Sequence, residues 1–240
     1  DGQVSRRSGM ACCIDAVPFG PREGGGILPH EETFSGPKED RFALMKATAA
    51  QLSPIFGLHA DEQGTATKLL QEVMSKSQPD ITADMGDGVL HEVWTITDEQ
   101  TISAYQKALA GEDVFIADGH HRYNTALNYI RHLEAESGKP LPADHPARRC
   151  MIVLVGMSDP GLIIWPTHRV LGGMKDYSID RFIEAAKPHM TVTPAGDDIT
   201  RLESAMQAAA EGAAGRNVLG LYDVASGRTF VATLTASDPL

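Results

Sequence analysis

The sequence has few cysteines. Its three cysteines, Cys12, Cys13 and Cys150, are too few for a disulfide framework, and adjacent cysteines are poorly placed to bridge to each other. We therefore expect free thiols and a reducing compartment, the cytoplasm. Because side chains alternate along a strand, Cys12 and Cys13 should point to opposite faces of the strand that carries them.

Basic residues are also scarce. The chain has 21 lysines and arginines against 32 aspartates and glutamates, which gives a formal net charge of −11. This balance argues against a surface that holds nucleic acid through its phosphates, because such a surface needs a basic patch. A small phosphorylated ligand, held by a local cluster of cations, remains compatible with it.

Long apolar runs are absent as well. No stretch approaches the roughly 20 apolar residues that span a bilayer, and no signal peptide is recognisable, so we expect no membrane partner. Residues 2–17 already alternate like a strand inside a sheet, and residues 233–240 end abruptly. We therefore expect a fragment of a longer protein.

Apolar runs of strand length alternate with amphipathic runs of helix length through most of the chain. This pattern is typical of a mixed α/β fold, with a mixed sheet and flanking helices. Strands are expected at 8–16, 26–30, 53–59, 88–96, 113–117, 150–156, 161–166, 190–194, 217–222 and 229–234. Helices are expected at 37–51, 65–77, 98–110, 119–136, 179–186 and 198–211.

A segment with several prolines, 138–149, is the best candidate for a linker or flexible loop. It divides the chain into a motif-bearing α/β domain, 1–145, and a second α/β portion, 146–240. Whether the second portion packs as one unit with the first is left open.

The most informative segment is 114–127, VFIADGHHRYNTAL, where an apolar strand runs into a tight turn and a helix. A helix N-terminus offers unpaired amide donors and a partial positive charge, so it is suited to an anion such as phosphate. Helical phase places His121 opposite the buried stripe, with His120 and Arg122 at its edges. We expect His121 and Arg122 to contact the phosphate directly, Arg122 without a structural carboxylate partner, and His120 to orient a neighbour.

Asp118 stands at the carboxyl end of this strand, where open α/β sheets place their ligands. Its carboxylate suits either a helix cap or a magnesium ion. The alternative is that Asp118 is only a cap and that the two histidines after it are merely solvated.

Polar residues also follow an earlier apolar run. His30 and Glu31 come directly after it, which suits a base and a metal-binding carboxylate entering the same cleft. Lys38 and Arg41 lie one helical turn apart and share a face. The alternative interpretation is a capped, solvated helix start.

A third cluster, WPTHR at 165–169, follows another apolar run and contributes His168 and Arg169. By itself it carries little information. We expect it to line one cleft together with the clusters around His30 and His121.

Taken together, these motifs resemble an uncharacterised prokaryotic family, domain of unknown function 1015. They occur in the family's order and span about 9–169: LPHEET at 28–33 continuing to Arg41, SPIF at 53–56, IADGHHRY at 116–123 and PTHR at 166–169. Family members carry an N-terminal portion ahead of the first strand seen here. The resemblance therefore implies that some residues of the site lie outside this sequence.

The turn after Asp118 is also similar, more distantly, to the phosphate-gripping turn of the ParB, sulfiredoxin and archaeal free serine kinase group. There, a glycine followed by polar residues and an arginine opens a helix that holds nucleotide phosphates. This resemblance implies close backbone approach at Gly119, phosphate contacts from His121 and Arg122, and a metal or proton role for Asp118. Histidines stand where ParB has an acidic and a basic residue, so CTP use and a DNA clamp are not implied.

The motifs predict an enzyme that binds a nucleotide such as ATP or ADP with Mg²⁺ and transfers or hydrolyses a phosphoryl group. Catalytic roles are expected for Asp118, His30, Glu31 and His168, and Asp118 and Glu31 are the expected magnesium ligands. The expected phosphate contacts are Gly119, His120, His121, Arg122, Lys38, Arg41 and Arg169.

Two other functions stay open at this point. One is a metal-dependent hydrolase with His30, Glu31, His120 and His121 as metal ligands, although these histidines lack the helical His-x-x-x-His spacing. The other is a nucleotide-sensing module that does no chemistry. The expected partner is a phosphorylated small molecule, with no nucleic acid and no membrane, and a homodimer is compatible with the sequence.

Overall fold

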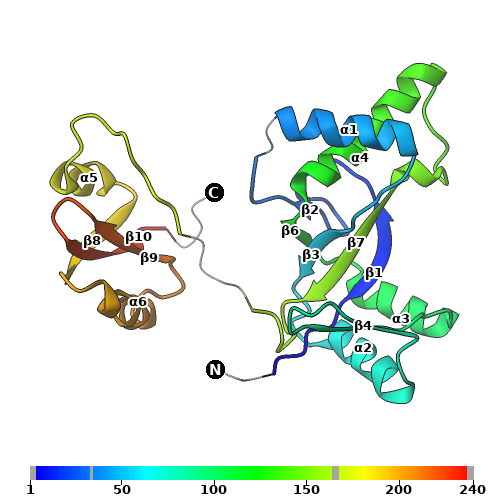
Figure 1. The fold of residues 1–240 in the computed structure, drawn as a ribbon, viewed down its shortest axis with the longest axis horizontal. Helices are drawn as coiled ribbons and strands as arrows, with labels where there is room; N and C mark the ends of the chain where they lie inside the picture. The colour runs from blue at the N-terminus through cyan, green and yellow to red at the C-terminus, as the bar shows by residue number, and fades with distance from the viewer. Residues whose placement is uncertain (1–3, 33–34, 164–167, 237–240) are drawn as a thin grey trace. The chain divides into compact units, whose positions relative to one another are not determined.

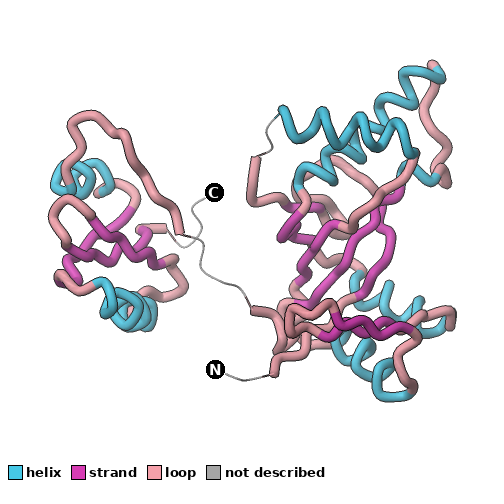
Figure 2. Tube along the Cα trace, in the orientation of Figure 1, coloured by secondary structure: helices cyan, strands magenta, loops and turns pink. Residues whose placement is uncertain are grey.

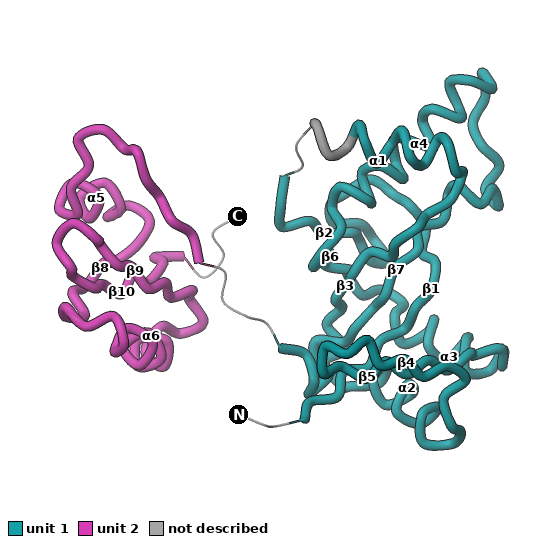
Figure 3. The backbone as a smooth tube through the Cα atoms, viewed as in Figure 1, with its two compact units in different colours: residues 1–165 teal, residues 166–240 magenta. Residues whose placement is uncertain are grey.

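The computed structural model describes residues 4–32, 35–163 and 168–236, and for 35–38 it describes the backbone alone. The chain forms two compact units, Asp1–Trp165 and Pro166–Leu240 (Figure 3). Helices and strands alternate along both (Figure 2), as expected of a mixed α/β fold. The division lies later than the expected boundary at 145/146, because the strand Arg149–Gly156 pairs with two strands of the first unit's sheet.

The first unit is built on a five-stranded mixed sheet of order β1-β7-β3-β6-β2 (Figure 1). The strands are β1 (Met10–Asp15), β7 (Arg149–Gly156), β3 (Ile55–His59), β6 (Val114–Asp118) and β2 (Ile27–Leu28). Strand β3 runs parallel to β7 and antiparallel to β6, whereas β2 runs parallel to β6. The parallel pair β2 and β6 positions the candidate site.

Helix α4 (His120–Ser137) covers one face of this sheet and packs against helix α1 (Ser35–Thr48) (Figure 1). The core contains residues from α4 and from four strands: Ile27, Ile55, Ile116, Tyr123, Ala126, Leu127, Cys150, Ile152 and Leu154. The predicted apolar stripe of α4 is therefore confirmed as the stripe that faces the sheet.

A second, smaller hydrophobic cluster joins helices α2 (Thr65–Lys76) and α3 (Glu99–Leu109), around Ala66, Leu70 and Tyr105. Between these helices the chain forms a hairpin of β4 (Ile81–Asp84) and β5 (Leu90–Val93). Strand β4 was not predicted from the sequence. Its side chains are mostly exposed, and among the described strands it pairs with β5 alone. An exposed short strand of this kind leaves little apolar pattern to detect.

The second unit is a three-stranded antiparallel sheet of order β8-β10-β9 with two helices. Its elements are α5 (Ile179–Ala186), β8 (Met190–Gly196), α6 (Leu202–Glu211), β9 (Val218–Asp223) and β10 (Arg228–Leu234). Two short 3-10 helices, Pro146–Arg148 and Ile199–Arg201, complete the described structure.

The strand expected at 161–166 is wrong over 161–163, and residues 164–167 lie outside the described residues. The Asp159 carboxylate accepts hydrogen bonds from the Ser8 backbone and hydroxyl and from the Gly161 amide. This bonding holds a turn where the apolar pattern had indicated a strand. Among the described residues, no helix has both the length and the apolar character needed to cross a membrane.

The three cysteines are free thiols, as predicted, and the two adjacent ones point to opposite faces of β1. Cys13 is exposed, Cys12 packs against the core and Cys150 is buried within it. Burial raises the pKa of Cys12 to about 11, helped by the charge of Cys13, and burial raises the pKa of Cys150 to about 12.

Because thiolate is the reactive form, a thiol reagent such as DTNB at pH 8 should modify Cys13 quickly and the other two cysteines slowly. Counting the thiols that react before and after denaturation checks this. Cys13→Ser should remove the fast phase, and a fast phase that persists in this variant would contradict the buried placement of the other two.

Candidate functional site

The parallel pairing of β2 with β6 brings two distant motifs to the same edge of the sheet. Ile27 pairs with Val114, and Leu28 pairs with Phe115, so the two strands end side by side. His30 and Glu31 follow β2, and His120 is the first residue of α4 after β6. The two motifs therefore meet, as expected, at His30, Glu31 and His120; that the clusters line one common cleft stays a prediction.

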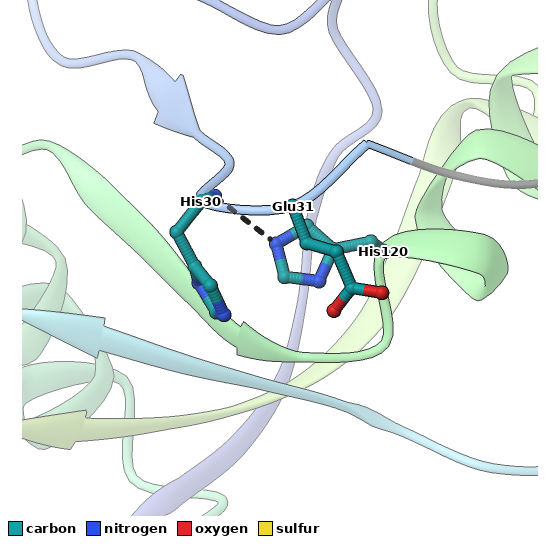
Figure 4. Close-up of side chains that lie close together, drawn as sticks. All are labelled: His30, Glu31 and His120. Carbon is teal, nitrogen blue, oxygen red and sulfur yellow. Dashed lines mark hydrogen bonds between the residues drawn. The ribbon is translucent and has the colours of Figure 1, made fainter. Parts of the chain in front are cut away.

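The two imidazoles lie against each other, with ring centroids 4.5 Å apart and planes at 90° (Figure 4). The His30 backbone N–H donates to Nε2 of His120 over 3.3 Å. Nδ1 of His30 lies 2.8 Å from the carbonyl oxygen of Ile116, which can only accept a hydrogen bond. In the neutral ring Nδ1 of His30 is therefore the protonated nitrogen, and Nε2 keeps its lone pair.

Glu31 completes a cluster that is suited to a metal ion. One ligand atom from each of His30, Glu31 and His120 lies within 4.8 Å of the others (Figure 4). His30 and Glu31 are exposed, whereas His120 is only 4% exposed. Of the described residues, His121 and Asp118 are not part of this cluster.

Burial favours the neutral form of His120. Its pKa is lowered from 6.5, first by burial and then by the neighbouring His30, against smaller opposing effects of Glu31 and Asp118. The ring therefore carries a lone pair at neutral pH. Helical phase placed His120 at the edge of the buried stripe, where a side chain is only partly buried. His120 is buried more deeply than this, because the segment after β2 packs over the start of α4.

The turn before α4 depends on glycine. Gly119 has φ 103°, a value that L side chains rarely adopt, and it is the N-cap of the helix without a side-chain cap. A Cβ at this position would lie 3.1–3.2 Å from the guanidinium of Arg122. Arg122 therefore folds back over the turn, and a larger residue than glycine would crowd its guanidinium.

The prediction that Arg122 has no carboxylate partner is wrong. Its guanidinium donates to the Asp118 carboxylate and the Pro54 carbonyl oxygen, and to the Ser53 hydroxyl over 2.8 Å. These contacts arise because β3 pairs with β6, with Phe56 opposite Asp118, which brings the chain before β3 to the turn. Asp118 is thus bound to an arginine, and magnesium binding by Asp118 and Glu31 stays a prediction.

His121 is half-buried at the first turn of α4, and its Nδ1 is buried without a hydrogen-bond partner among the described residues. Its backbone carbonyl accepts a hydrogen bond from the Thr125 hydroxyl. An unpartnered ring nitrogen costs free energy unless something binds it, so it is a candidate ligand contact.

A small pocket of about 40 Å³ brings two of the predicted phosphate contacts together. Arg41 of α1 and Arg122 of α4 both line it, with Gln51, Ser53 and Thr125 among the other residues. The Lys38 side chain lies outside the described residues, so its predicted contact stays a prediction.

A larger cavity of about 290 Å³ opens at the amino end of β3, lined by Arg7, Ser8, Gly9, Pro54, Ile55, Phe56, Val153 and Val155. The guanidinium of Arg7 lies 5.2 Å from the centre of the Phe56 ring. Pro54 belongs both to this cavity and to the set of residues that bind Arg122. Arg7 was not among the predicted site residues, because an isolated arginine before a strand does not indicate a binding site without the fold.

Comparison with known protein families agrees with these motifs. Residues 2–236 match the model of the family described as protein of unknown function (DUF1015). The chain belongs to the DUF1015 family. The match extends well past Arg169, so the second unit is part of the DUF1015 pattern as well. No curated protein and no solved structure matches the chain.

The third predicted cluster falls in the second unit of this DUF1015 chain. His168 and Arg169 are exposed, and Arg169 donates to the His168 carbonyl oxygen over 3.4 Å. Pro166 and Thr167 lie outside the described residues. That His168 and Arg169 join the site therefore stays a prediction.

Proposed function

We propose that this DUF1015 chain binds a phosphorylated ligand, a nucleotide such as ADP or ATP, at the turn between β6 and α4, and that it transfers or hydrolyses a phosphoryl group. The observation that carries the proposal is the uncapped start of α4. Gly119 provides no side-chain cap, so the first-turn amides of an 18-residue helix have no side-chain acceptor there. Such amides, with the positive end of the helix dipole, bind anions.

The cations around this turn support the same ligand. Arg41 and Arg122 line one pocket, and the Arg122 fork suits phosphate oxygens. The Asp118 side chain is 73% exposed, and an ion pair at such a position contributes little to stability. A phosphate can therefore replace Asp118 on Arg122, which frees the carboxylate to accept a proton from the attacking group.

The cavity at the amino end of β3 provides room for the organic part of the ligand or for the phosphoryl acceptor. Its volume of about 290 Å³ is close to the lower end of the range for small-molecule sites. Because Pro54 lines this cavity and also binds Arg122 through its carbonyl oxygen, a ligand held by Arg122 can extend into this cavity.

Binding and turnover test the proposal separately. Thermal shift of the purified chain with ADP, ATP and inorganic phosphate should show stabilisation, about 2.7 kcal/mol for a ligand at a hundred times its Kd. Phosphorus NMR should then detect the conversion of the nucleotide. No stabilisation by any of the three compounds would contradict the binding site, and binding without conversion would favour a nucleotide-sensing module.

Arg41→Gln is the informative variant, because Arg41 lines the pocket but has no ion pair among the described residues. It should weaken nucleotide binding about 10- to 100-fold, as expected for one lost charge-assisted hydrogen bond, and leave the melting temperature unchanged. Arg131→Gln, at an exposed position of α4, is the matched control and should bind like the parent chain.

A further inference from the structure

We infer that His30, Glu31 and His120 form a binding site for a divalent transition metal of the zinc, manganese or cobalt class. The donor set points to this class, because imidazole nitrogen binds zinc and its neighbours in the series, whereas magnesium prefers oxygen ligands. Two histidines and one glutamate are also a set of three that leaves a coordination position open. The magnesium site expected at Asp118 and Glu31 is a different site, with one residue in common.

The geometry requires only a small closure. Metal–ligand bonds of about 2.0–2.1 Å in a tetrahedral site place ligand atoms about 3.3 Å apart. The three ligand atoms already lie within 4.8 Å of one another. Most of the remaining movement falls to the exposed side chain of Glu31, whereas His30 keeps its contact with the Ile116 carbonyl oxygen and the buried His120 stays in place.

The surroundings orient the ligands as they do in known metal sites. Metal-binding histidines usually donate their other ring N–H to a carbonyl or carboxylate. Nδ1 of His30 makes this contact with the carbonyl oxygen of Ile116 at 2.8 Å. The bond from the His30 backbone to Nε2 of His120 is long, at 3.3 Å, so a cation can replace that donor.

The position of the cluster connects the metal to the anion site. His120 is the first residue of α4, directly after Gly119, so a metal held by the cluster would lie near the start of this helix. A metal held there can coordinate a phosphate oxygen bound by the first-turn amides. This second step rests on the proposed function, whereas metal binding by the three residues does not.

Calorimetric titration of the chelator-stripped chain with ZnCl₂, MnCl₂, CoCl₂ and MgCl₂ tests the site without any nucleotide. We expect one equivalent of zinc or cobalt to bind, cobalt to give visible absorption bands typical of nitrogen ligands, and magnesium to bind at least about 10-fold more weakly. If none of the three transition metals binds, or if magnesium binds as tightly as zinc, the inference is wrong.

Variants assign the binding to these residues. His30→Ala and Glu31→Gln change exposed positions and should each weaken zinc or cobalt binding at least about 10-fold, with an unchanged far-UV CD spectrum. His91→Ala, at an exposed position of β5, is the matched control and should bind metal like the parent chain. If the two site variants bind metal like the control, these residues are not the ligands.

The outcomes separate this inference from the proposed function. Metal binding that depends on His30 and Glu31, without stabilisation by any phosphate compound, would leave the metal site intact and contradict the phosphate site. Nucleotide binding that persists in chelator-stripped protein, without metal uptake, would support the phosphate site and contradict the metal site.

Discussion

Replacing Tyr123 with alanine should lower the free energy of unfolding by about 3–5 kcal/mol. The Tyr123 side chain is fully buried between α4 and the sheet, and its ring centre lies 5.0 Å from that of Phe19. Its hydroxyl donates to the Val17 carbonyl oxygen at 2.6 Å and accepts from the Val17 amide at 2.9 Å. Alanine leaves a cavity and also removes both hydrogen bonds to the segment that follows β1.

Tyr123→Phe separates these two effects, because it keeps the ring and removes only the hydroxyl. Two backbone groups of Val17 then lose their partner, which should cost about 1–3 kcal/mol. Tyr129→Phe on the same helix is the control, since the Tyr129 hydroxyl makes no hydrogen bond among the described residues.

Chemical denaturation of the full chain, followed by far-UV CD, measures all three variants. The two units can unfold in separate transitions, so the transition that Tyr123→Ala shifts is the one to compare. If Tyr123→Phe is no less stable than Tyr129→Phe, the two hydrogen bonds to Val17 do not contribute to the free energy of unfolding.

Gly119→Ala should lower the stability by about 1–3 kcal/mol, because it combines an unfavourable backbone conformation with a steric contact. Gly119 has φ 103°, and the added Cβ would lie 3.1–3.2 Å from the Arg122 guanidinium. The Arg122 guanidinium would then have to shift, which disturbs its contacts with Asp118 and Pro54. We therefore expect nucleotide binding to weaken in the same variant, since the arginine is displaced from its position over the turn.

The other end of the same helix provides the control. Gly138 follows α4 with φ 66°, and a Cβ there would meet nothing within 4 Å. Gly138→Ala should therefore cost only about 1–2 kcal/mol of backbone strain, with nucleotide binding unchanged. Equal losses of stability in both variants, with equal nucleotide binding, would show that the contact with Arg122 has no consequence.

Short-range patterns in the sequence determined the local elements of this protein. The apolar period of 3.6 after the turn predicted α4 at 119–136, and the helix spans His120–Ser137. The apolar run before Asp118 predicted β6 in the same way. The alternation of β1 predicted that Cys12 and Cys13 point to opposite faces, and Cys12 is the one that packs against the core. These features depend on neighbours a few residues apart, which the sequence displays directly.

Only the tertiary structure decided how the motifs combine. The parallel pairing of β2 with β6 places His30 against His120, ninety residues later. The antiparallel pairing of β3 with β6 brings Ser53 and Pro54 to Arg122, which also binds the Asp118 carboxylate, a partner that the sequence did not predict. Strand pairing depends on the packing of the whole core, so a motif by itself does not indicate which other motif will lie beside it.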